Sequence, residues 1–163
     1  MQILNQFSYV IISAIVLLAS IVLMRRYGIN RRLMSAVVGA LVVFSLSSFF
    51  LLRPGVSDVD SASSMRTMIE NGKPTLLEFF SNYCAGCLAL RPAVDLLASD
   101  IESEFNILRI DIHTDLGREI RNQFGFTFTP EFVLFDNTGQ EIWRDHTLPP
   151  REQVNALANT LRQ

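Results

Sequence analysis

Charge is missing from two long parts of this sequence. No charged residue occurs among residues 1–24 or 33–52, and none of the 16 acidic residues precedes Arg53. A run of roughly 20 apolar residues is long enough to cross the hydrocarbon core of a membrane. The first run also has no positive charge before it, because Arg25 and Arg26 come after it. A cleaved signal peptide begins with a positively charged region, so we do not expect this run to be one.

The two apolar runs predict a membrane anchor over residues 1–53, with transmembrane helices at about 5–24 and 33–52. Residues 25–32 between them contain four arginines, and short arginine-rich loops stay on the cytoplasmic side. We therefore expect a multi-pass hairpin in the lipid bilayer of a cell or thylakoid membrane, with the rest of the chain on the extracytoplasmic side. In the alternative, the second run is a single signal-anchor and the first lies at the membrane interface. That arrangement also places the rest of the chain outside.

The chain after Arg53 has few bases and only two cysteines. It carries 16 acids against nine bases, so it lacks the basic patch of a nucleic-acid-binding protein. A structural zinc site needs four ligands, and the chain offers Cys84 and Cys87 with His113 and His146 in no characteristic spacing. A structural disulfide between the two cysteines would constrain little chain and add little stability. We therefore expect neither a metal site nor a nucleic-acid partner.

The chain after the anchor divides into a linker with a first helix, residues 54–73, and one domain, residues 74–163. Residues 56–64 are polar and rich in Ser and Asp, which predicts a short tether. The first helix is expected to begin after Ser61 or Ser64. No strong strand pattern precedes this helix, so we expect none there.

The domain begins with a buried strand. The apolar run at residues 75–81 leads directly into Cys84-Ala85-Gly86-Cys87 and a long helical pattern. A second strand at 106–112 completes a βαβ unit. The remaining expected elements are a helix at 114–124 capped by Thr114, a hairpin of strands at 131–136 and 140–144, and a final amphipathic helix with Val154, Leu157 and Leu161 on one face.

This order of elements around a Cys-x-x-Cys resembles the thioredoxin fold, an α/β architecture with a central mixed sheet flanked by helices. The resemblance rests on three further positions: Glu78 six residues before Cys84, Pro92 five residues after Cys87, and Thr129-Pro130 before the hairpin. With the anchor, the chain resembles the membrane-tethered thioredoxins of bacteria and chloroplast thylakoids, and residues 124–136 also resemble the C-terminal domain of DsbD reductases. Tyr83 stands where thioredoxins have Trp, and Ala85-Gly86 replaces their Gly-Pro, which bears on redox potential and substrate choice.

The two cysteines are the expected catalytic pair. A Cys at a helix start has its thiolate favoured by unpaired backbone N–H groups and the helix dipole, and the thiolate is the form that attacks a disulfide. Cys84 occupies this place, and Cys87 lies one turn later to resolve the mixed disulfide. The redox-active disulfide Cys84–Cys87 would be the only redox group, with no bound cofactor.

Glu78 is the candidate proton acceptor for Cys87. A carboxylate within an apolar strand would have a raised pKa, and Glu78 is surrounded in sequence by Leu76, Leu77, Phe79 and Phe80. The alternative is an acid on an exposed strand edge.

The resemblance implies a substrate-binding edge beside the cysteines. Pro130 would be cis, Thr129 would hydrogen-bond an incoming extended segment through its backbone, and Tyr83 would line the same surface. Disulfide-bearing proteins are the implied substrates.

We expect an extracytoplasmic reductant, for example in cytochrome c maturation or disulfide repair. The compartment outside is oxidising, and the membrane runs contain no Cys to relay electrons. A membrane electron donor of the CcdA or DsbD type is therefore implied; an oxidant would need a quinone-linked reoxidase instead. The second hypothesis is an accessory, assembly or redox-sensing subunit of a larger membrane protein complex.

Overall fold

A four-stranded mixed sheet forms the centre of the domain. The computed structural model of the chain describes residues 2–161, and the side chains of residues 3–158. Strand β1 (Thr75–Phe80) pairs in parallel with β2 (Asn106–Asp111) and antiparallel with β3 (Glu131–Phe135), which in turn pairs antiparallel with β4 (Glu141–Asp145). The strand order is β2-β1-β3-β4. The predicted βαβ unit and hairpin are confirmed.

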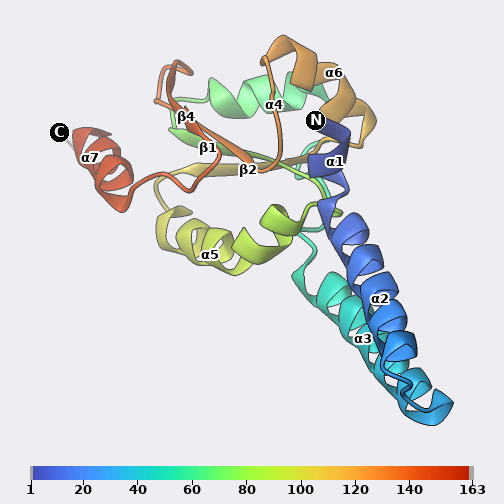
Figure 1. Cartoon of the computed structure of the whole chain (residues 1–163). Helices are drawn as coiled ribbons and strands as arrows, with labels where there is room; N and C mark the ends of the chain where they lie inside the picture. Colours follow the sequence, from blue (N-terminus) through green and yellow to red (C-terminus); the bar gives the residue numbers. More distant parts are fainter. Residues whose placement is uncertain (1, 162–163) are drawn as a thin grey trace.

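Helices cover both faces of the sheet (Figure 1). Helices α4 (Ala62–Ile69) and α6 (Asp115–Gln123) pack on one face, while α5 (Ala85–Ile101) and α7 (Arg151–Leu161) pack on the other. The N-caps of α4 and α6 are residues that the sequence indicated. Ser61 Oγ accepts from Ser64 N at the start of α4, and Thr114 Oγ1 accepts from Gly117 N at the start of α6. In α7, Val154 and Leu157 pack toward α5, and the predicted role of Leu161 lies outside the described side chains.

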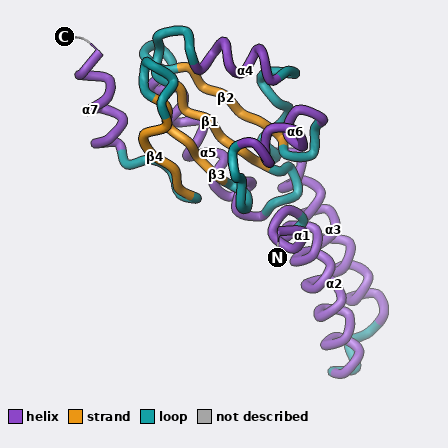
Figure 2. The backbone as a smooth tube through the Cα atoms, turned by 90° about the horizontal axis from the view of Figure 1, so that it is seen from above, coloured by secondary structure: helices purple, strands orange, loops and turns teal. Residues whose placement is uncertain are grey.

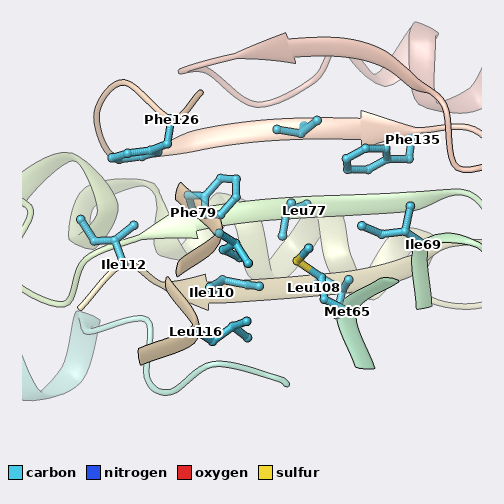
Figure 3. Packing of buried hydrophobic residues seen from close by; sticks show 12 residues of the cluster. Met65, Ile69, Leu77, Phe79, Leu108, Ile110, Ile112, Leu116, Phe126 and Phe135 are labelled. Carbon is cyan, nitrogen blue, oxygen red and sulfur yellow. The ribbon is translucent and has the colours of Figure 1, made fainter. Parts of the chain in front are cut away.

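The alternation of side chains along β1 separates two cores. Leu77 and Phe79 lie in the cluster under α4 and α6, shown in Figure 3 with their neighbours from β2 and β3. Leu76 faces α5 and α7, and Phe80 packs against the two cysteines. Because successive side chains of a strand point to opposite faces, Glu78 lies on the same face as Phe80. The strand thus brings a carboxyl group to the side of the sheet that holds the cysteines.

Two long apolar helices extend from the domain as a hairpin (Figures 1 and 2). Helix α2 (Ser8–Arg26) and helix α3 (Arg31–Leu52) are both long and apolar enough to cross a membrane, and almost none of their residues is buried. The turn between them is shorter than the predicted loop 25–32. Arg25 and Arg26 complete α2, and Asn30 caps α3 by accepting from Leu33 N.

The long helix of the first apolar run begins at Ser8, three residues after the expected start of the span at about residue 5. Asn5 and Gln6 belong to a separate short helix, α1 (Gln2–Gln6), and α2 begins only at Ser8. Two polar groups of this segment bind the domain: the Asn5 side chain bonds Thr129, and the backbone carbonyl of Gln6 accepts from Ser81 Oγ. Uncompensated polar groups are costly in hydrocarbon, and here they are satisfied by protein.

The linker is not a free tether. The backbone N–H and C=O of Gly55 both bond the Asn82 side chain, at 3.0 and 2.7 Å. Asp58 N donates to the carbonyl of Arg109 in β2 at 2.9 Å, and Arg109 N donates to Asp58 Oδ2 at 2.7 Å. Within residues 2–161 no strand precedes α4, and these linker bonds satisfy part of the free edge of β2.

Candidate active site

Cys84 is the N-cap of α5, directly after the turn that follows β1. Its Sγ accepts a hydrogen bond from Cys87 N at 3.3 Å and lies 3.5 Å from the carbonyl oxygen of Thr129. The pKa of Cys84 is lowered to about 6. The Cys87 thiol is the main cause because it donates to the Cys84 sulfur; Thr129 and backbone N–H groups add to this effect, while burial opposes it. At neutral pH Cys84 is therefore mostly thiolate.

Cys87 has the opposite character. Its side chain is fully buried, at 0% exposure, and burial is the main cause that raises its pKa far above the ordinary value for a thiol. The neighbouring Cys84 raises it further. Both cysteines are unpaired thiols in the structure. The pair is thus divided into a thiolate nucleophile and a protonated thiol one helical turn away.

Glu78 is buried, at 4% exposure, and not on an exposed edge. It lies opposite Arg109 of β2, whose Nε is 3.5 Å from Glu78 Oε2 and whose Nη1 is 2.8 Å from Asp95 Oδ1. Burial raises the pKa of Glu78 to about 7; Arg109 lowers it, and Asp95 and Asp58 raise it. A carboxyl group with this pKa can take up and release a proton near neutral pH. Its role toward Cys87 stays a prediction.

The Thr129–Pro130 peptide bond is cis, as the resemblance implied, and Thr129 is buried beside Cys84. The Pro130 ring packs closely on the first turn of α5: a Cβ added to Gly86 would lie only 3.3 Å from Pro130 Cδ. The loop before β3 therefore contacts the helix that carries the cysteines. This is the edge where the resemblance placed substrate binding.

Tyr83 faces the helical hairpin. Its ring stacks on Phe7 and on Phe49 of α3, with centroids 5.6 and 5.9 Å apart, and it meets the His113 ring edge-on. Tyr83 as a whole is still 38% exposed. Tyr83 therefore connects the cysteine site to the helical hairpin, a contact that its position before Cys84 did not predict.

The two histidines take no part in a common site. His113 Nε2 lies 3.0 Å from Ser81 Oγ, and His146 Nδ1 lies 2.9 Å from the carbonyl of Pro130 while its ring stacks on Phe128. Among the described residues, no group of three or more His, Cys, Asp or Glu side chains could hold a metal ion.

Sequence reasoning missed the residues that cover the site. Asn5 and Ser8 come from the first apolar run, yet Asn5 bonds Thr129 and Ser8 Oγ accepts from Ala85 N at 2.9 Å. The available signal was the presence of polar residues within an otherwise apolar run. With these groups in place, Cys84 is only 1% exposed.

The family model for thioredoxin matches residues 56–162, well over half of the chain. The chain belongs to the thioredoxin family. Among its relatives, it is 31% identical over 139 residues to the thioredoxin-like protein HCF164, chloroplastic, of Arabidopsis thaliana, an alignment that covers 80% of this chain and 52% of that protein. It is also 31% identical over 108 residues to a thioredoxin of Pyropia yezoensis, covering 66% and 95%.

Solved structures agree on the fold. A thioredoxin from Trypanosoma brucei brucei superposes with a TM-score of 0.54 at 18% identity, covering 68% of this chain and 95% of that one. The expected thioredoxin fold is confirmed. The chain spans 52% of HCF164 and 60% of thioredoxin X of Arabidopsis thaliana, so it matches only part of these longer relatives.

Proposed function

We propose that this protein is a membrane-anchored thiol-disulfide oxidoreductase that reduces disulfides of proteins on the extracytoplasmic side. The observation that carries the proposal is the difference between Cys84, whose pKa is lowered, and Cys87, whose pKa is raised. A cysteine with a pKa of about 6 is placed at the start of α5, beside the Thr129–Pro130 loop, and a buried thiol stands one turn behind it.

The reaction proceeds in two exchanges. The Cys84 thiolate attacks one sulfur of the substrate disulfide; the substrate S–S bond breaks, and the leaving thiolate takes up a proton. Cys87 then loses its proton and attacks Cys84 Sγ, which forms the Cys84–Cys87 disulfide and releases the second substrate thiol. In total the pair gives two electrons to the substrate; one of the two protons comes from the Cys87 thiol and the other from solvent, because Cys84 reacts as a thiolate.

Glu78 is the group that would accept the proton of Cys87. It lies on the cysteine side of β1, and its pKa of about 7 suits proton transfer at neutral pH. Arg109 stabilises the ionised form by its ion pair at 3.5 Å.

The membrane assignment rests on α2 and α3. Both helices leave their apolar surfaces uncovered, and a surface of this size is stable in a bilayer but not in water. The four arginines around the turn between them favour a cytoplasmic turn. Protease treatment of sealed, oriented membrane vesicles tests this: cleavage of the domain only from the extracytoplasmic side is expected.

Electrons would come from a membrane protein of the CcdA or DsbD type, and cytochrome c maturation is a candidate process. The deciding experiment is the reduction potential of Cys84–Cys87 in the full chain in detergent micelles, equilibrated with dithiothreitol or glutathione buffers. A value near about −270 mV supports the reductant, while a value near about −120 mV overturns it in favour of a disulfide-forming oxidant. The Cys84→Ser variant is the control, because it cannot form the pair.

A further inference from the structure

The nucleophile of this site is buried beside residues of the first apolar run. Cys84 is 1% exposed. To attack a protein disulfide, however, the sulfur of Cys84 must be accessible to that disulfide. Residues 5–9, the end of α1 and the start of α2, bind the residues around Cys84, namely Thr129, Ala85 and Tyr83, and we call them the N-terminal cap. Figures 1 and 2 show α1 at the head of the helical hairpin, against the end of the sheet.

Asn5 occupies the edge to which a substrate would bind. Its Nδ2 donates to the carbonyl of Thr129 at 2.8 Å, and its Oδ1 accepts from Thr129 N at 2.9 Å and from Thr129 Oγ1 at 3.0 Å. A carboxamide presents the same donor and acceptor as a peptide group. Asn5 therefore takes both backbone groups that would pair with an extended substrate segment.

The rest of the cap holds the other side of the site. Ser8 Oγ accepts from Ala85 N, in the first turn of α5, at 2.9 Å. Tyr9 N donates to the carbonyl of Tyr83 at 3.0 Å, and the Phe7 ring stacks on the Tyr83 ring. The cap thus contacts the chain on both sides of Cys84, through groups that an incoming substrate would need.

We propose that the N-terminal cap is an autoinhibitory segment that mimics bound substrate and must leave before Cys84 can attack. The inference rests on the proposed function, because it concerns access to the same thiolate. The cap is part of the same chain as the site, so it competes with substrates at a high effective concentration. Only substrates or partners that displace Asn5 from Thr129 reach the sulfur.

The test is the alkylation rate of Cys84 by iodoacetamide in the reduced full chain in detergent micelles, followed by mass spectrometry. The double variant N5A/S8A removes four hydrogen bonds to Thr129 and Ala85. Each such bond corresponds to a factor of about two to ten in an equilibrium. We expect the variant to react at least about ten-fold faster than the wild type at the high-pH plateau, where Cys84 is fully ionised in both.

The matched control is N155A/S99A, which changes the same residue types at exposed positions of α7 and α5 and should leave the rate unchanged. Equal plateau rates in wild type and N5A/S8A, with unchanged circular dichroism, overturn the proposal. If N5A/S8A does not fold, Phe7→Ala replaces it: a plateau rate faster than wild type supports the proposal, and an equal rate with unchanged circular dichroism overturns it.

Reduction of insulin disulfides, with dithiothreitol as electron source, separates the two proposals. Faster alkylation with faster insulin reduction supports both. Faster alkylation without any insulin reduction supports the cap and overturns the proposed function.

Discussion

Replacing Glu78 by Gln should change how the stability of the domain depends on pH. The pKa of Glu78 rises from an ordinary 4.5 to about 7 in the folded protein, chiefly through burial. Between these values the unfolded chain releases the proton while the folded domain keeps it. The free energy of unfolding therefore falls as pH rises from about 4.5 to about 7 and then levels off. The loss corresponds to about 3 kcal/mol at most.

Gln cannot ionise, so E78Q should lose this component and gain stability relative to the wild type between pH 5 and pH 8. The assay is urea unfolding of the reduced full chain in micelles. It is followed by the fluorescence of Trp143, the single tryptophan, which packs against the core between the sheet, α5 and α7. The control E152Q alters an exposed Glu at the start of α7. Wild-type and E78Q curves that stay parallel across this range would refute the reasoning.

Three further predictions follow from the site and its support. Cys87→Ser should let Cys84 attack but stop resolution, so the mixed disulfide with insulin should accumulate on a non-reducing gel; its absence would contradict the assigned order of attack. Alkylation of Cys84 in N5A/S8A should rise with pH through about 6 and reach a plateau above pH 7, because only the thiolate reacts; a midpoint near 8.5 would contradict the lowered pKa. Gly117→Ala should destabilise the domain by roughly 1–3 kcal/mol in urea unfolding, since its Cβ would lie 2.1 Å from the carbonyl oxygen of Asp111; an unchanged midpoint would show that α6 can shift at no cost.

The local patterns of the sequence predicted most of the domain. The apolar run from Thr75 and the Cys-x-x-Cys marked β1 and the start of α5, and the caps Ser61 and Thr114 marked α4 and α6. Each of these signals acts between residues a few positions apart. The burial of Glu78 was also predictable from its apolar neighbours.

The contacts of the N-terminal cap and the linker could not be predicted in this way. Asn5 and Thr129 are 124 positions apart, and Gly55 and Asn82 are 27 apart. The run of apolar residues placed Asn5 in a membrane helix, and the Ser- and Asp-rich composition of residues 56–64 indicated a short tether. Their true partners become visible only when the fold brings distant backbone groups together.

The bonds of the linker along β2 also limit what the protein can reach. A free chain over residues 53–61 could extend about 30 Å. The domain could then take up many positions relative to α2 and α3. With Gly55 and Asp58 held by Asn82 and Arg109, the domain stays close to the helical hairpin of α2 and α3. In the proposed membrane arrangement, a membrane-bound target reaches the domain by lateral diffusion at the bilayer surface, so the two-dimensional density of such targets sets their encounter rate.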